Sequence, residues 1–315
     1  AKAPPWRVMR PETVTLAARF HVALLKAVAG TGMQLDAVEL SNEPDGSWNI
    51  RIAPADYLTL VRTVRSEAAR RGVALPRIFG PGASRVVETH PFFRDETIAR
   101  GILDAVDVVS LHGWDDAAGK DRNAELDRLL ARFAELGRKP ELAVTEFGVG
   151  LPDMRDKSPS MNARNRGEDN IGLSAAYGSY STRDLLKLYA GKVGIAIQWE
   201  FQDLGWGKGS LGLLDLRGRE KPVYRAMRTL AERLEADKPV SITTSPDGRV
   251  ALLRRSGGDS LIVSNPARTP IEIVFRDRRP VSLPAYASAC ACKGPAGPGL
   301  RLPGESVTAI PLAPG

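Results

Sequence analysis

Two short stretches of the chain decide the fold, and they read DAVELSNEP (Asp36–Pro44) and ELAVTEFG (Glu141–Gly148). Each is a mostly apolar run, typical of a buried strand, that leads to a glutamate: Glu43 in the first and Glu146 in the second. An unpaired charge at the exit of a buried strand is costly, so packing explains these carboxylates poorly. The pair is therefore a candidate for acid/base chemistry.

Strands and helices alternate from Pro11 onward. Helices are expected from Pro11 to the glycines at 30 and 32, near Pro54–Arg71, at Ala124–Leu136 and Arg183–Tyr189, and near Pro222–Leu234; strands are expected at Ala37–Leu40, Arg77–Gly80, Val106–Leu111, Leu142–Thr145 and Val193–Trp199. This alternation, with nearly continuous apolar strands, predicts an α/β domain in which helices cover a parallel sheet. We assign residues 1–237 to this domain.

The pattern changes after residue 237. Short strand-like segments such as Val250–Leu253, Ser260–Val263 and Ile271–Val274 follow one another, most of them separated by Pro, Gly and Asp turns. This spacing is typical of a small antiparallel β-sandwich, which we assign to residues 238–315.

Composition excludes several classes of protein. The 315 residues are 43% hydrophobic and carry a net charge of +7, but no compact basic block interleaved with aromatics suggests nucleic-acid binding. Unbroken apolar runs fall short of the roughly 18 residues of a membrane span. No His-x-x-x-His, Cys-x-x-Cys or phosphate-binding glycine pattern occurs, so neither a metal nor a cofactor is expected. Cys290 and Cys292 are either bridged or free, and leave the redox compartment undecided.

The aromatic and histidine residues favour a shared cleft. The tryptophans stand in predicted loops or at strand exits, where their faces could bind the apolar faces of sugar rings or simply pack in a core; they are Trp6, Trp48, Trp114, Trp199 and Trp206. Strand exits at the carboxyl edge of a parallel (β/α) barrel form its active site. His112 would lie there, able to bind a substrate hydroxyl or orient a carboxylate. His21 and His90 are interpreted as structural.

Ser41-Asn42-Glu43-Pro44 followed by Val144-Thr145-Glu146-Phe147 resembles the paired signatures of clan A glycoside hydrolases. Within the clan the chain looks most like family 30, with families 39 and 5 as the nearest rivals. The resemblance implies a (β/α)8 TIM barrel with a C-terminal antiparallel β-sandwich. Strands 1–3 of that barrel are missing from this chain, so a companion N-terminal segment or chain is expected to supply them.

Carried over by position, the resemblance implies a role for each candidate site residue. Glu43 would be the general acid/base, Glu146 the nucleophile and Asn42 the donor to the sugar 2-hydroxyl. His112 and Trp199 would line the subsite of the cleaved sugar. Trp114 stands where relatives often keep a tyrosine, which puts the usual hydroxyl bond to the nucleophile in question.

The resulting hypothesis is a retaining glycoside hydrolase that cleaves a β-glycosidic bond in a polysaccharide or glycoconjugate by double displacement. A secreted or periplasmic location is expected. The alternative is a non-catalytic carbohydrate-binding protein on an incomplete barrel. Transglycosylation by the same glutamates differs only in how well water is excluded, and the sequence does not separate it from hydrolysis.

Overall fold

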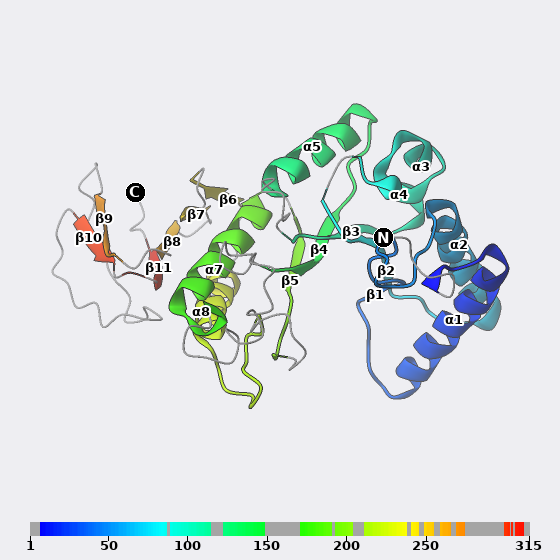
Figure 1. The fold of residues 1–315 in the computed structure, drawn as a ribbon, viewed down its shortest axis with the longest axis horizontal. Coiled ribbons are helices and arrows are strands. Elements are labelled where there is room, and N and C mark those ends of the chain that lie inside the picture. The colour runs from blue at the N-terminus through cyan, green and yellow to red at the C-terminus, as the bar shows by residue number, and fades with distance from the viewer. Residues whose placement is uncertain are drawn as a thin grey trace. The chain divides into compact units, whose positions relative to one another are not determined.

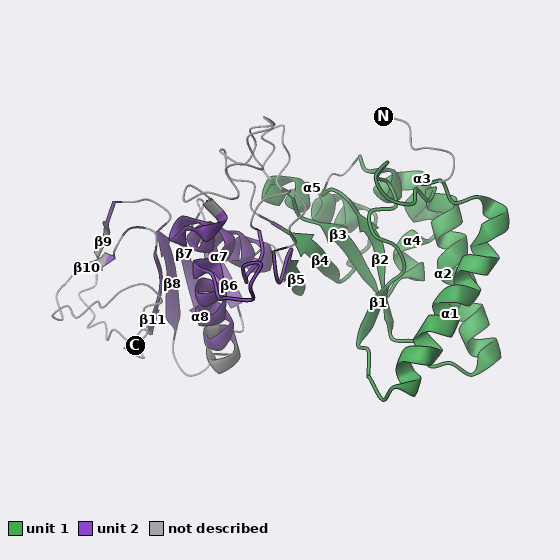
Figure 2. Ribbon diagram, turned by 60° about the horizontal axis from the view of Figure 1, so that its bottom comes forward, with its two compact units in different colours: residues 1–147, 193–197 green, residues 148–192, 198–315 purple. Residues whose placement is uncertain are grey.

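The fold is given by a computed structural model. It describes residues 7–86, 89–114, 122–148, 171–190, 193–203, 211–237, 241–245, 249–254, 259–265, 269–274, 299–302, 304 and 306–311. The chain divides into two compact units: residues 1–147 with 193–197, and residues 148–192 with 198–315 (Figure 2).

The first unit is built on a parallel sheet whose strands follow one another in chain order (Figure 1). The strands are β1 (Ala37–Glu39), β2 (Arg77–Ala83), β3 (Val108–His112), β4 (Leu142–Phe147) and β5 (Ile195–Gln198, whose last residue falls in the second unit). Apolar side chains cross the whole sheet, because Phe79, Val108 and Ala143 form one buried cluster with Ala37 and Ile195 at its margins. The predicted α/β class with a parallel sheet is confirmed.

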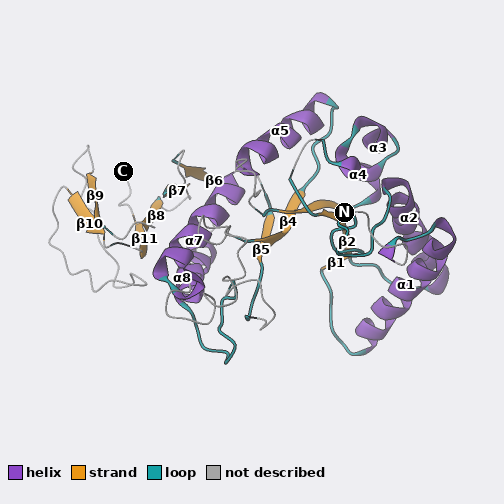
Figure 3. Cartoon of the chain, in the orientation of Figure 1, coloured by secondary structure: helices purple, strands orange, loops and turns teal. Residues whose placement is uncertain are grey.

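Helices lie before and between these strands, as Figure 3 shows. They are η2 (Pro11–Thr13), α1 (Val14–Gly30), α2 (Pro54–Arg71), η3 (Pro91–Phe93), α3 (Asp95–Ala99), α4 (Ile102–Ala105) and α5 (Arg122–Glu135). The sequence marks the ends of α2 clearly: Pro54 occupies its first turn and Gly72 ends it at φ 63°, a left-handed backbone that favours glycine. The short helices α3 and α4 escaped prediction, since each is about one turn long and shows no periodicity.

Helix α1 has two apolar faces. Val14, Ala18, Val22 and Leu25 are buried, and α1 packs against α2. A second set is exposed on the same helix: Leu16, Phe20 and Leu24. By length and composition alone the segment Pro11–Gly30 could cross a membrane, which a search for unbroken apolar runs missed. Only 22% of its apolar window is buried, so α1 packs on α2 through one face alone.

The second unit combines two long helices with antiparallel strands. Its elements are η5 (Ile171–Leu173), α7 (Ala175–Ala190), α8 (Pro222–Asp237), β6 (Ser241–Thr244), β7 (Val250–Arg254), β8 (Ser260–Asn265), β9 (Ile271–Val274), β10 (Gly299–Leu302) and β11 (Ser306–Pro311). One sheet has the order β11-β8-β7-β6, and β10 pairs with β9 separately. A separate antiparallel sheet is thus present, while the sandwich and the boundary at 238 stay predictions.

Helix α7 begins eight residues before the predicted start at Arg183. Its first half is rich in Gly, Ser and Thr, which are weak helix formers, so the periodic signal is hidden. The reason for the small residues is packing: a Cβ added at Gly178 would lie 3.1 Å from the Cβ of Ala226 and 3.2 Å from the Cα of Val223. Tertiary contact with α8 therefore overrides local propensity here.

Candidate active site

Glu43 lies on a tight turn beyond the end of β1. Its φ of 46° is in the left-handed region, which costs a non-glycine residue on the order of 1 kcal/mol or more. Two backbone hydrogen bonds hold it there: Glu43 N–H donates to the Gly82 carbonyl at 3.0 Å, and Gly46 N–H donates to the Glu43 carbonyl at 2.9 Å. Because of this left-handed turn, the Glu43 side chain points in a different direction from that of a residue in an extended strand.

An ionised aspartate anchors this turn to the loop after β2. Asp45 accepts hydrogen bonds from the Ser84 N–H, at 2.9 Å, and from the Ser84 hydroxyl, and it lies 3.1 Å from His90 Nε2. Burial alone would raise the pKa of Asp45, but the bond to His90, its charge and the two bonds from Ser84 outweigh burial and lower that pKa to about 2. His90 is buried and stacks on Phe92, which agrees with its structural interpretation.

Both carboxylate oxygens of Glu43 have partners. Oε1 lies 2.9 Å from His112 Nδ1. Oε2 accepts a hydrogen bond from the indole N–H of Trp48 and a longer one, 3.4 Å, from the Asn49 amide. The Glu43 side chain is only 12% exposed, so these bonds fix its orientation.

Glu146 lies within β4, one residue before its end. Its backbone is held by the sheet, since Glu146 pairs with His112 of β3 and its carbonyl accepts the Gly113 N–H at 2.7 Å. Its carboxylate Oε1 accepts the indole N–H of Trp114 at 2.6 Å. The indole of Trp114 therefore gives this carboxylate a hydrogen-bond donor, although no hydroxyl stands at that position.

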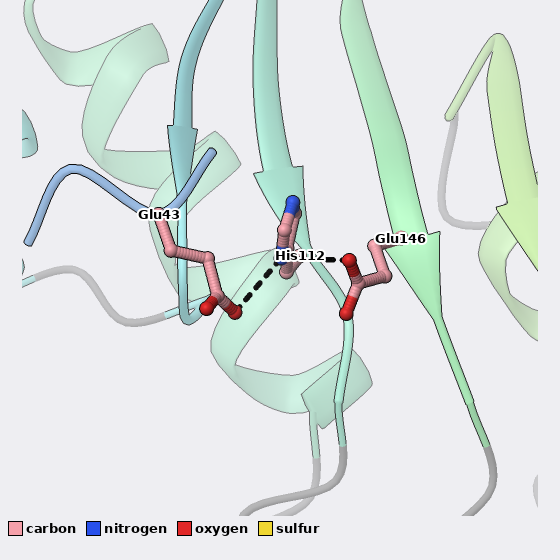
Figure 4. A group of neighbouring side chains, drawn as sticks. All are labelled: Glu43, His112 and Glu146. Atoms are coloured by element: carbon pink, nitrogen blue, oxygen red, sulfur yellow. Dashed lines mark hydrogen bonds and ion pairs between the residues drawn. The ribbon is translucent and has the colours of Figure 1, made fainter. Parts of the chain in front are cut away.

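His112 lies between the two glutamates and is 1% exposed (Figure 4). Its Nδ1 is 2.9 Å from Glu43 Oε1 and 3.7 Å from Glu146 Oε2. Burial lowers the pKa of His112, but the hydrogen bond to Glu43 and the charges of Glu146, Glu43 and Glu39 outweigh burial, so the pKa is raised. A protonated imidazole here offsets the repulsion between two neighbouring carboxylates.

The same three side chains offer ligands from three different strand ends. One donor atom from each of Glu43, His112 and Glu146 lies within 4.8 Å of the others. Carboxylate and imidazole are ligand types that zinc accepts. A search for short metal motifs could not find this set, because the residues come from distant parts of the sequence.

The structure brings together five of the predicted site residues: Glu43, Trp48, His112, Trp114 and Glu146. Asn42 is exposed next to Glu43, and Trp199 follows β5 in the second unit. Trp6, Trp206 and both cysteines lie outside the described residues. The catalytic and binding roles of all these residues stay predictions.

A third carboxylate was missed by sequence reasoning. Glu39, at the end of β1, accepts hydrogen bonds from the hydroxyls of Ser110 on β3 and Thr145 on β4, the latter at 3.1 Å. Burial raises the pKa of Glu39 although both hydroxyls and His112 work against it. The sequence did carry a signal for Glu39: it is a glutamate inside an apolar strand, four residues before Glu43 in the stretch Asp36–Pro44.

Comparison with known proteins finds relatives by structure alone. No family model and no curated protein matches the chain. The GH39 enzyme from Xanthomonas axonopodis pv. citri matches with a TM-score of 0.57 at 15% identity, over 97% of this chain and 74% of its own. A GH30 endoxylanase from Clostridium papyrosolvens C71 gives 0.58 at 16% identity, over 96% and 72%. A conserved exported protein from Bacteroides fragilis gives 0.64 at 14%, over 96% and 70%.

At such identities the likeness shows the fold. The expected resemblance to clan A glycoside hydrolases is confirmed at that level. Family 39 and family 30 structures match with similar scores, so the preference for family 30 over family 39 gains no support from the fold.

Proposed function

We propose that this chain carries the catalytic pair of a retaining β-glycosidase acting on a polysaccharide or glycoconjugate. The observation that carries the proposal is the close approach of Glu43 and Glu146, each offering an oxygen within 4.8 Å of the other and of His112. Carboxyl groups of retaining enzymes are separated by about 5–5.5 Å, whereas inverting enzymes need roughly 6.5–9.5 Å. The fold likeness to GH39 and GH30 structures supports carbohydrate as the substrate class.

The reaction proceeds in two displacements. A Glu146 oxygen attacks the anomeric carbon while Glu43 gives its proton to the leaving oxygen, so that the glycosidic bond breaks and a glycosyl ester forms on Glu146. Glu43 then takes a proton from water, and the resulting hydroxide attacks the same carbon and releases Glu146. An acceptor sugar in place of water would give transglycosylation.

The surrounding groups give both carboxylates hydrogen-bond donors and a neighbouring imidazole. The Trp114 N–H bond stabilises the charged form of Glu146, as a nucleophile requires. The raised pKa of His112 keeps positive charge beside both carboxylates over a wider pH range. Asn42 is proposed to bind the sugar 2-hydroxyl, and the tryptophans are proposed to line the sugar subsites: Trp6, Trp48, Trp114, Trp199 and Trp206.

The five strands are proposed to be strands 4–8 of a (β/α)8 barrel that a companion N-terminal segment or chain completes. The strands lie in the order β1 to β5, and five strands are too few to close such a barrel. Helix α1 exposes Leu16, Phe20 and Leu24, which an adjoining βα unit would cover. The natural protein is expected to be heavier than this chain or to co-purify with a partner. Full activity from a natural protein of this chain's 34.0 kDa would contradict the barrel proposal.

Export from the cytoplasm is part of the proposal. One structure with the same fold is named a conserved exported protein. Fractionation of the source cells should recover the protein outside the cytoplasm, and its recovery in the cytoplasmic fraction would contradict export.

The direct test is a screen of aryl β-glycosides and polysaccharides with the complete natural protein. NMR of the first product should show the β-anomer before mutarotation, and a slow fluorinated substrate should leave a glycosyl group on Glu146 in the peptide mass spectrum. First release of the α-anomer would indicate inversion. Glycan binding measured by calorimetry, with no product over long incubation, would favour the non-catalytic carbohydrate-binding alternative.

A further inference from the structure

Glu39 occupies an unusual position for a carboxylate, because its side chain crosses a neighbouring strand. Glu39 belongs to β1, the first strand in the sheet order. Its Oε1 accepts hydrogen bonds from Ser110 on β3 and Thr145 on β4. Strand β2 lies between β1 and β3. A single side chain therefore connects three strands of the sheet.

Glycine in β2 makes this crossing possible. A Cβ added at Gly82 would lie 2.9 Å from the carboxyl carbon of Glu39 and 2.7 Å from the Ser41 carbonyl, and the φ of Gly82 is +68°. Both the space and the backbone conformation therefore exclude a larger residue. Gly82, the last residue of the Gly-Pro-Gly sequence at 80–82, has this role in the strand.

The hydrogen bonds of Glu39 lead to both glutamates of the active site. On one side, the Ser110 hydroxyl donates to Glu39 and accepts the Gly82 N–H at 3.0 Å, and the Gly82 carbonyl accepts the Glu43 N–H at 3.0 Å. On the other side, the bonded Thr145 is the residue before Glu146. The backbones that carry the two carboxylates are thus tied to one common acceptor.

We propose that Glu39 is a positioning residue that sets the separation of the Glu43 and Glu146 carboxylates by joining β1, β3 and β4. The proposal rests on the proposed function, since the separation matters for a glycosidase. It deepens that function by assigning the spacing to a side chain that does not touch the sugar. Burial raises the pKa of Glu39, although the bonds from Ser110 and Thr145 oppose that shift.

The test compares the removal of one hydroxyl bond with a matched control. Thr145→Val removes the bond to Glu39 without changing charge, and should lower kcat about tenfold with KM nearly constant. Thr97→Val removes a buried hydroxyl that donates to the Pro91 carbonyl at 3.0 Å elsewhere in the unit, and should leave kcat unchanged. Equal kcat values for the two variants would overturn the proposal.

Variants of Glu39 itself separate positioning from simple folding. Glu39→Ala should lower kcat about 100-fold, because a small misplacement of reacting groups costs that much. Glu39→Gln keeps an acceptor oxygen and should recover most of this loss. Adding Thr145→Val to Glu39→Ala should cost nothing more, since the hydroxyl has already lost its partner. Additive losses would show that the two residues act separately and would overturn the proposal. If Glu39→Ala does not fold, Ser110→Ala breaks the other end of the tie while Glu39 keeps its bond to Thr145. It should lower kcat about tenfold, and the Ser110→Ala/Thr145→Val double variant should lose less than the sum of the two single losses, because either break already disconnects the two glutamates. Additive losses would again overturn the proposal.

A measurement without turnover separates this proposal from the proposed function. The His112 imidazole contacts both glutamates, so its NMR titration reports their placement. Thr145→Val should lower the pKa of His112, while Thr97→Val should not. An unchanged titration in Thr145→Val overturns the positioning role even in an active enzyme. A shifted titration in a protein that cleaves no glycoside supports the tie and rejects the glycosidase.

Discussion

The two glutamates are held by opposite means. Glu146 sits inside β4, where its backbone is paired with His112 and its carbonyl accepts the Gly113 N–H at 2.7 Å. Glu43 sits outside the ladder on a left-handed turn, which is secured by the Gly82 carbonyl and by the charged Asp45 network. One carboxylate is fixed by sheet hydrogen bonds and the other by a strained loop.

Both supports suit the proposed chemistry. A nucleophile must meet one carbon at one distance, and a strand in a sheet provides a rigid support. An acid/base group serves the leaving oxygen first and a water later, and the side-chain bonds to Glu43 hold it in one orientation for both. Four predictions test this contrast, in order of decreasing expected effect.

The largest effect is expected at the glutamates themselves. Glu146→Gln should lower kcat on the order of 10⁴-fold with every substrate, because no other group can form the ester. Glu43→Gln should cost about 10²–10⁴-fold with poor leaving groups and much less in the first step with activated ones, which need no proton. Steady-state and burst kinetics on an aryl glycoside series measure both.

A matched control lies just before β4, at the opposite end of the strand from Glu146. Glu141→Gln removes a carboxylate that pairs with Arg77 on the surface, and both partners are 47% exposed. It should leave kcat unchanged. If activated leaving groups restored the kcat of Glu146→Gln but not that of Glu43→Gln, the assigned roles would be reversed.

The indole hydrogen bonds are expected to matter unequally. Trp114→Phe removes a 2.6 Å bond to Glu146 and should lower kcat about 10- to 100-fold. Trp48→Phe should cost less than about tenfold, because Asn49 also donates to the same oxygen of Glu43 and Trp48 is 52% exposed. Kinetics of the two variants side by side check this order, and a larger loss in Trp48→Phe would contradict it.

The turn of Glu43 should be sensitive to acid. The pKa of Asp45 is depressed to about 2, so its ionised form stabilises the folded state above its ordinary pKa, and this contribution is lost as pH falls from about 4 towards 2. Asp45→Asn should remove about 2 kcal/mol of the free energy of unfolding at pH 6. Denaturant unfolding at several pH values should show a smaller loss between pH 4 and 2 in the variant. Parallel pH curves for the two proteins would contradict this origin of stability.

Removing metal ions should have the smallest effect. Although Glu43, His112 and Glu146 offer donors within 4.8 Å of one another, the proposed displacement uses both carboxylates without a metal ion. Dialysis against a chelator should therefore change kcat by less than about twofold. Loss of activity that zinc restores would assign the same three residues to a metal centre instead.

Much of the first unit could be predicted because its signals are local. Helix α2 shows its start at Pro54 and its end at Gly72, and the strands show as apolar runs between turns. The start of α7 could not be predicted, because Gly178 has a low helix propensity. Its small size instead allows close contact with α8. Glu39 was missed for a similar reason: its partners Ser110 and Thr145 stand 71 and 106 positions away.

The sequence by itself determined the alternation of strands and helices and placed Glu43, His112 and Glu146 at the ends of three different strands, because periodicity and strand exits are properties of neighbouring residues. Only the tertiary structure decided how these groups meet: the left-handed turn of Glu43, the imidazole between two carboxylates, the indole bond to Glu146 and the reach of Glu39 across Gly82. Each of these depends on distances between strands far apart in the chain, which register and packing set and which no local pattern encodes.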